Sequence, residues 1–194
     1  AKSEFGVFKN CVAAGGKIRG IAAKGCVDFT RKQIDELTAY VGKYGSKGLV
    51  WMRVKENDEV ETQVGKFFTT EQLNELRDAV GAKCGDMMFF IAGPEKVAAT
   101  AMGQLRLEVA RIKGLRDPKK REFVWITEFP MFEYSETEGR YMAMHHPFTN
   151  PLPEHLQMML DGNLKDCNAE AYDLVLNGVE IGGGSIRIHN PEVQ

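Results

Sequence analysis

The chain has 194 residues, of which 43% are hydrophobic and 27% charged, so it can bury a core and is not a disordered chain. Its 25 Lys and Arg residues are balanced by 27 Asp and Glu residues, which excludes a global positive field for nucleic acid, so any RNA contact has to be local. No apolar run approaches the roughly 18 residues that span a bilayer, and we expect a cytoplasmic protein without membrane contact. The four cysteines lack the spacing of a metal or redox motif, and we expect a structural or incidental role for them.

A weak strand at residues 17–21 precedes an internal repeat, in which residues 29–37 (FTRKQIDEL) return as residues 68–76 (FTTEQLNEL). Each copy has a Thr with a Gln three residues later and a Phe just before it, the pattern of a capping box with a hydrophobic staple. The pattern predicts helices that begin near residues 31 and 70. Each helix is expected to end at a glycine in the left-handed conformation, namely Gly42 and Gly81.

Short apolar runs bounded by glycine follow each helix, and they predict strands at residues 49–54 and 87–92. A long helix is predicted from Pro94, with apolar residues at helical spacing at Val97, Ala101, Leu105, Val109 and Ile112. A solenoid would need at least three repeats. We therefore predict an α+β fold whose residues 1–115 form a two-layer domain with an internal duplication. The charged segment at residues 116–121 is interpreted as a solvated linker in preference to a phosphate-binding site.

Residues 121–194 are rich in strands and are predicted to form a second, antiparallel domain. Runs at residues 123–127, 131–134 and 140–144 predict a meander. A proline-rich loop and a short amphipathic segment at residues 155–160 then precede a hairpin, which is predicted because Asn177 and Gly178 separate two hydrophobic runs.

The turn of this hairpin predicts a register in which Val175 lies opposite Glu180 and Asp173 lies opposite Gly182. Asp173 and Glu180 then share one face as diagonal neighbours, close enough to bind Mg²⁺ together with a phosphate-bearing substrate. Two solvated acids on an outward face remain the alternative at this point.

Three consecutive glycines, at residues 182–184, indicate a bulge or a close approach of the backbone to a ligand. Arg187 follows them, and its planar guanidinium could bind a carboxylate. Glu180 and Arg187 are seven residues apart, so an unbroken strand would place them on opposite faces; they share a site only if the glycines host a bulge. His145 and His146 could adjust their charge to an anionic substrate.

Four segments together, residues 123–134, 145–149, 171–178 and 180–187, resemble bacterial aspartyl-tRNA synthetases. Residues 1–115 resemble the GAD-type domain that these enzymes insert between class II motifs 2 and 3, which is related to a domain of an archaeal tRNA amidotransferase subunit. The resemblance implies that residues 121–194 form part of the antiparallel class II catalytic sheet. The chain begins without Met and stops after a strand, and we interpret it as an internal piece of a longer protein.

By this resemblance, the parent enzyme uses Mg²⁺ and ATP to form aspartyl-adenylate from aspartate, transfers aspartate to tRNA, and acts as a homodimer. Asp173 and Glu180 would bind Mg²⁺ and the ATP phosphates, Arg187 would bind the aspartate side chain, and His145 and His146 would lie near the amino-acid pocket. Class II motifs 1, 2 and 3 have no counterpart here, so the chain is expected to contain no catalytic residue, to hold no cofactor and to be inactive alone. The alternative is a non-catalytic module that binds tRNA or protein.

Overall fold

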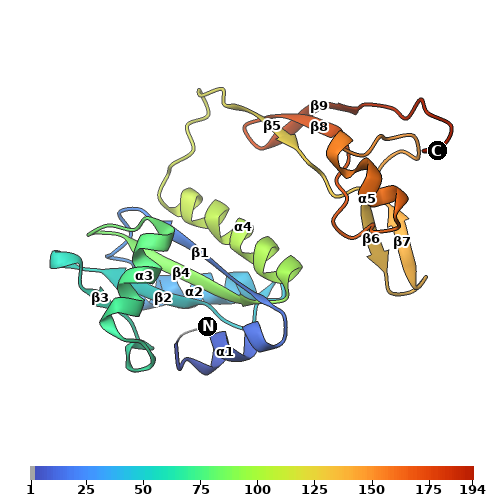
Figure 1. Cartoon of the computed structure of the whole chain (residues 1–194). Helices are drawn as coiled ribbons and strands as arrows, with labels where there is room; N and C mark the ends of the chain where they lie inside the picture. Colours follow the sequence, from blue (N-terminus) through green and yellow to red (C-terminus); the bar gives the residue numbers. More distant parts are fainter. Residues whose placement is uncertain (1–2) are drawn as a thin grey trace. The chain divides into compact units, whose positions relative to one another are not determined.

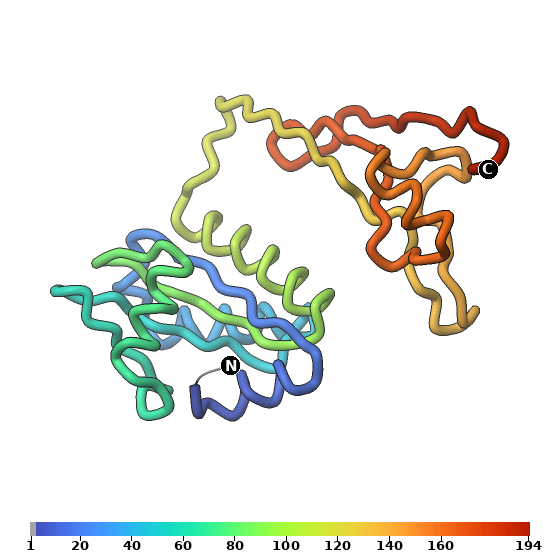
Figure 2. Tube along the Cα trace, viewed as in Figure 1, coloured from blue at the N-terminus to red at the C-terminus, as the bar shows by residue number. Residues whose placement is uncertain are grey.

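The structure is a computed structural model that describes residues 3–194, and its chain divides into two compact units between Arg116 and Asp117 (Figure 1). An irregular connection near residues 113–122 follows the last helix of the first unit (Figure 2). Each unit has its own sheet and its own core, and the units are described separately below.

The first unit has a four-stranded antiparallel sheet in the order β1-β4-β2-β3 and four α-helices. Its strands are β1 (Lys17–Ala23), β2 (Val50–Val54), β3 (Val60–Glu61) and β4 (Met87–Gly93). Its helices are α1 (Gly6–Ala13), α2 (Arg31–Gly42), α3 (Thr70–Val80) and α4 (Glu95–Ile112), with short 3₁₀ turns η1 (Glu56–Asp58) and η2 (Gly65–Phe67). No helix in residues 3–194 is long and apolar enough to cross a membrane.

Strand β4 lies inside this sheet and is buried on both faces. Met87, Phe89 and Ile91 belong to one core, whereas Met88 and Phe90 belong to another, and all five are at most 3% exposed. Successive side chains of a strand point to opposite faces, so an apolar run without alternation indicates a strand covered on both sides. The two cores therefore lie on opposite faces of one sheet.

The two-layer prediction for this unit is wrong, because helices cover both faces of the sheet. The first core contains buried residues of α2 and α4, including Ile34, Leu37 and Leu105. The second contains Phe8 of α1, with residues of α3 packed against it. The unit is a three-layer arrangement: helices α2, α3 and α4 were predicted, whereas α1, which helps to cover the second face, was not.

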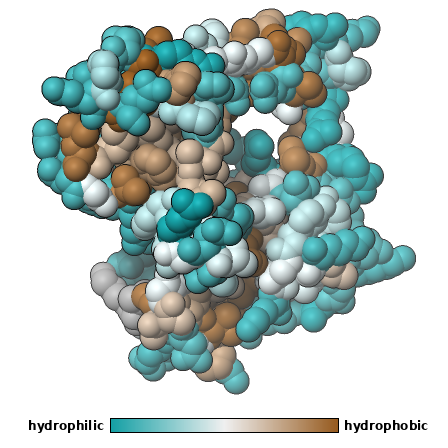
Figure 3. Space-filling view, turned by 90° about the vertical axis from the view of Figure 1, so that its right-hand side faces the viewer, coloured by the Kyte–Doolittle hydropathy of each residue, from teal (hydrophilic) through white to brown (hydrophobic). Residues whose placement is uncertain are grey.

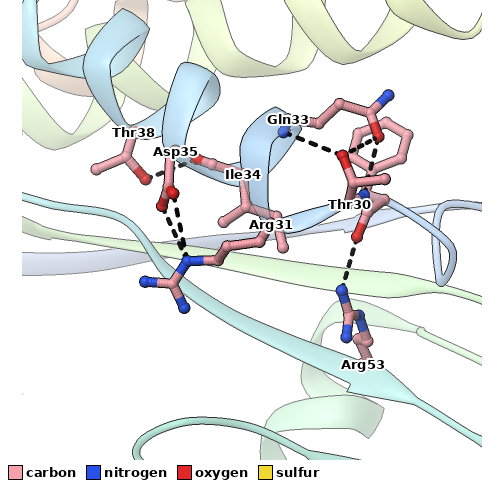
Figure 4. A network of polar contacts seen from close by, with 8 residues as sticks. Thr30, Arg31, Gln33, Ile34, Asp35, Thr38 and Arg53 are labelled. Carbon is pink, nitrogen blue, oxygen red and sulfur yellow. Dashed lines mark hydrogen bonds and ion pairs between the residues drawn. The ribbon is translucent and has the colours of Figure 1, made fainter.

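Both predicted helix starts are confirmed, with complete capping boxes. At α2, Gln33 N donates to Thr30 Oγ1 at 3.3 Å, and Thr30 N donates to Gln33 Oε1 at 2.9 Å (Figure 4). At α3, Thr69 and Gln72 make the same two bonds at 3.3 and 3.0 Å. Arg53 of β2 also donates to the Phe29 carbonyl at 2.6 Å, which ties the sheet to the start of α2.

Only one of the two predicted helix ends has the expected geometry. Gly81 has a φ of +64° and caps α3 in the left-handed conformation. Gly42 is instead the last residue of α2, and Lys43 after it remains right-handed; the left-handed residue is Gly45, with a φ of +84°. Pro94 caps α4 and is not its first residue.

The second unit has a three-stranded antiparallel sheet in the order β5-β8-β9 and a separate hairpin of β6 and β7. Its elements are β5 (Phe123–Thr127), β6 (Phe132–Ser135), β7 (Arg140–Ala143), the 3₁₀ turn η3 (Pro153–His155), α5 (Leu156–Leu160), β8 (Ala171–Leu176) and β9 (Val179–Ser185).

The predicted meander is wrong, because β5 pairs with β8 and not with β6. Glu128 has a φ of +58°, which turns the chain directly after β5. Pro130 lacks the N–H that a continuing strand ladder would need. These two residues end the strand, and the following residues form the separate β6–β7 hairpin.

The second unit leaves much of its sheet uncovered within the described residues. Its core is small and consists of Met131, Cys167, Ala169 and Ala171. Every residue of β5 is exposed, including Trp125 at 59%. On the side of the molecule drawn in Figure 3, exposed apolar side chains occur in scattered groups among hydrophilic ones.

All four cysteines are free. Cys26 and Cys167 are buried, and the loss of solvation raises the pKa of both thiols above the ordinary value. Both therefore stay protonated at neutral pH.

A matched pair of glycine substitutions tests the two helix ends. An added Cβ meets open space at both Gly42 and Gly81, so only the backbone conformation differs between them. We expect Gly81→Ala to lower the free energy of unfolding by about 1 kcal/mol, because alanine is strained at positive φ. Gly42→Ala should raise it by roughly 0.5 kcal/mol, because alanine favours helix. Urea denaturation measures both, and equal effects of the two substitutions would contradict the assignment.

Candidate functional site

The β8–β9 hairpin has the predicted turn. Asn177 and Gly178 have φ values of +50° and +84°, the left-handed conformation that a two-residue hairpin turn requires at both positions. Val175 pairs with Glu180, and Leu176 pairs with Val179, as predicted. Asn177 also accepts from Glu122 N at 2.9 Å through its side chain, which joins the turn to the residue before β5.

Beyond these first two pairs the predicted register is wrong, because β9 contains a bulge. Leu174 pairs with Gly182 and Asp173 with Gly183, so Ile181 is an extra residue on β9. An extra residue reverses the alternation of side chains beyond it. Glu180 and Arg187 can consequently serve the same side of the hairpin, as a shared site requires, although the bulge precedes the glycines.

All five residues singled out in the sequence line one open cavity of about 290 Å³ in the second unit. Its wall consists of Phe129, His145, His146, Thr149, Ala171, Asp173, Glu180, Gly184, Ser185 and Arg187. These residues come from three separate parts of the chain, and the folding of the unit brings them together.

The glycines of β9 make room for side chains of β8. A Cβ on Gly183 would collide with Asp173 Oδ1 and would lie 3.0 Å from the Tyr172 carbonyl oxygen. A Cβ on Gly184 would lie 2.9 Å from the Tyr172 hydroxyl oxygen, whereas one on Gly182 would meet nothing within 4 Å. Side chains of β8 therefore approach closely at two of the three glycines, and at Gly183 the approaching group is a carboxylate of the cavity.

The charged groups of the cavity do not neutralise one another. Among the ion pairs found in residues 3–194, none includes Asp173, Glu180 or Arg187. Asp173 is half-buried, while Glu180 and Arg187 are exposed. Two carboxylates and one guanidinium thus remain available to a ligand that carries charges of both signs.

The two carboxylates of the cavity suit Mg²⁺ only when a phosphate-bearing substrate supplies further ligands. Residues 3–194 contain no group of three or more His, Cys, Asp or Glu side chains placed to hold a metal. Mg²⁺ is commonly bound by one or two carboxylates together with substrate phosphates and water. Asp173 and Glu180 fit that pattern, because Gly183 leaves space for the Asp173 carboxylate.

Each histidine has one ring nitrogen engaged in the local structure. His145 Nε2 lies 3.2 Å from the Pro130 carbonyl oxygen, and its ring contacts Phe129 edge to face. His146 Nδ1 accepts from Phe148 N at 3.1 Å, so neutral His146 carries its proton on Nε2. The other nitrogen of each ring is free for a ligand or for water.

Sequence reasoning missed Thr149 and Ser185, which line the same cavity. Their hydroxyl oxygens are 3.2 Å apart. Both residues lie within segments that carry the family resemblance, but neither was singled out, because they become neighbours only when the segment that contains Thr149 meets the end of β9.

In a comparison with known families, residues 8–102 match the model of the GAD domain. The mixed α/β architecture of the first unit, with its antiparallel sheet, is consistent with this match.

The whole chain is similar to a segment of bacterial aspartate–tRNA ligases. It is 47% identical over 192 residues to an aspartate–tRNA(Asp/Asn) ligase of Desulfatibacillum aliphaticivorans and 48% identical over 193 residues to one of Caldanaerobacter subterraneus subsp. tengcongensis. It is 45% identical over 194 residues to an aspartate–tRNA ligase of Ruminiclostridium cellulolyticum. These alignments cover 99 to 100% of the chain but 32% of each relative, so the chain spans about a third of their length. The resemblance inferred from the motifs is confirmed.

A second pair of glycine substitutions tests the geometry of the carboxylates. In Gly183→Ala the new methyl group should displace the Asp173 side chain and shift its carboxyl carbon resonance, because the two groups cannot occupy the same space. Gly182→Ala adds the same methyl group in open space and should leave that resonance in place. NMR spectra of the ¹³C-labelled chain report both, and an unchanged Asp173 signal in Gly183→Ala would contradict the described approach.

Proposed function

We propose that this chain is part of an aspartate–tRNA ligase that forms aspartyl-adenylate from aspartate and ATP and then transfers aspartate to tRNA. The observation that carries the proposal is the cavity in which Asp173, Glu180, Arg187, His145 and His146 meet. Similarity to named ligases over the full chain supports it. The chain spans about a third of those relatives, so the reaction belongs to a longer protein.

Arg187 is proposed to bind the side-chain carboxylate of aspartate. A guanidinium offers paired donors in a plane that matches a carboxylate, and it has no acceptor for the amide N–H₂ group of asparagine. The lack of an ion pair to Arg187 within residues 3–194 supports this role. His145 and His146 are proposed to line the amino-acid end of the cavity, each with one ring nitrogen available.

Asp173 and Glu180 are proposed to hold Mg²⁺ and, through it, the phosphates of ATP. When bound, Mg²⁺ would offset the negative charge that develops on the α-phosphate. The protein contributes two carboxylates on one side of the hairpin, oriented by the Ile181 bulge and by the space over Gly183.

We further propose that the chain by itself is inactive, because class II motifs 1, 2 and 3 have no counterpart in its sequence. The tRNA, and a second subunit of a homodimer, would be partners of the whole ligase. The alternative is a non-catalytic module that binds tRNA or protein. It explains the GAD domain but not why two carboxylates and an arginine share a cavity in the second unit.

Aspartate-dependent exchange of pyrophosphate into ATP tests the proposal. We expect no exchange by the 194-residue chain and exchange by a full-length ligase that contains it. In that ligase Glu180→Gln should lower kcat/KM by about 100-fold, the typical scale for losing one electrostatic contact to a transition state.

Glu136→Gln, an isosteric change in the exposed β6–β7 turn outside the cavity, is the matched control and should retain exchange. If the isolated chain catalyses exchange and its Glu180→Gln variant does not, the proposed inactivity of the isolated chain is contradicted. Full exchange by the Glu180→Gln ligase would contradict the proposed site.

A further inference from the structure

Thr149 is the buried polar side chain of the candidate site. The buried polar or charged residues among residues 3–194 are Ser3, Asp86 and Thr149, and only Thr149 of these belongs to the second unit. Its side chain is 1% exposed although its neighbour Phe148 is 46% exposed. Burial of a hydroxyl is unfavourable unless hydrogen bonds replace the lost water, so the partners of Thr149 indicate what it does.

The backbone holds Thr149 directly beside Arg187. The two residues form an isolated antiparallel bridge. On either side of it, Asn150 N donates to the Ile186 carbonyl and Ile188 N donates to the Phe148 carbonyl, each at 2.8 Å. The position of Thr149 is therefore determined by main-chain bonds to both sides of Arg187.

The Thr149 hydroxyl has two partners, and both line the cavity. Its oxygen lies 3.2 Å from Ser185 Oγ and 3.5 Å from Arg187 Nη1. Arginine has donors only, so Arg187 donates and Thr149 Oγ1 accepts. In the bond between Thr149 and Ser185, either hydroxyl can be the donor.

We propose that Thr149 is a positioning residue, which together with Ser185 holds the Arg187 guanidinium in the orientation that receives the substrate carboxylate. This inference rests on the proposed role of Arg187. An exposed arginine without an ion pair samples many rotamers, and fixing it before the ligand arrives reduces the entropy lost on binding. Thr149 therefore acts through Arg187 and sets affinity for the carboxylate ligand.

Steady-state kinetics of a full-length ligase that contains this segment tests the proposal. Thr149→Val keeps the shape of the side chain and removes the acceptor. We expect it to raise KM for aspartate by about tenfold, the equivalent of one hydrogen bond to a charged group. KM for ATP and kcat should stay within about twofold, since the Thr149 hydroxyl bonds to Ser185 and Arg187 and not to Asp173 or Glu180. Thr149→Ser restores the oxygen and should restore KM for aspartate.

A further variant distinguishes failure of the proposed function of the cavity from failure of the positioning role of Thr149. Arg187→Ala should raise KM for aspartate more than Thr149→Val does. If Arg187→Ala has no effect, the proposed function of the cavity fails. If Arg187→Ala raises KM and Thr149→Val does not, only the positioning role fails.

The Thr149→Val substitution could also act by unfolding the second unit, and the 194-residue chain is used to test this. Thermal unfolding of the Thr149→Val chain shows whether it stays folded. If it does not, Ser185→Ala removes the second hydroxyl from a half-buried position and should still raise KM for aspartate. A Ser185→Ala ligase with unchanged KM for aspartate would then overturn the proposal, because the hydroxyl pair would have no influence on Arg187.

Discussion

The candidate site depends on one irregularity in strand pairing: β9 has one residue more than β8 between two paired segments. Without Ile181 as the extra residue, Arg187 would face away from Glu180, because side chains alternate along a regular strand. With it, the two carboxylates and the arginine line one cavity. Glycine at residue 183 completes the arrangement, since a larger residue would occupy the space of the Asp173 carboxylate.

Another part of the cavity wall is built where residues 148–150 pair through their main chain with residues 186–188. Thr149 lies against Arg187 in that pairing, and His146 accepts a bond from the backbone of Phe148. The segment from His146 to Asn150 therefore contributes an imidazole group, a hydroxyl group and part of the backbone frame. Because the frame is fixed by backbone bonds, the ends of the charged side chains remain free to meet a ligand.

The two units are stabilised in different ways. The first has two cores, one on each face of a sheet built around β4, and helices cover both. The second buries only four side chains in its core and leaves β5 exposed, so it depends more on strand pairing. The unit with the candidate site is thus the one with less apolar burial.

The sequence by itself determined the features that depend on neighbouring residues: the capping boxes at Thr30 and Thr69 and the Asn177-Gly178 turn. Only the tertiary structure decided the third layer of the first unit, the pairing of β5 with β8, and the position of the bulge. The physical reason is the distance along the chain over which each interaction acts. A cap or a tight turn is completed within about four residues, whereas the face that a helix covers and the partner of a strand depend on contacts between distant segments.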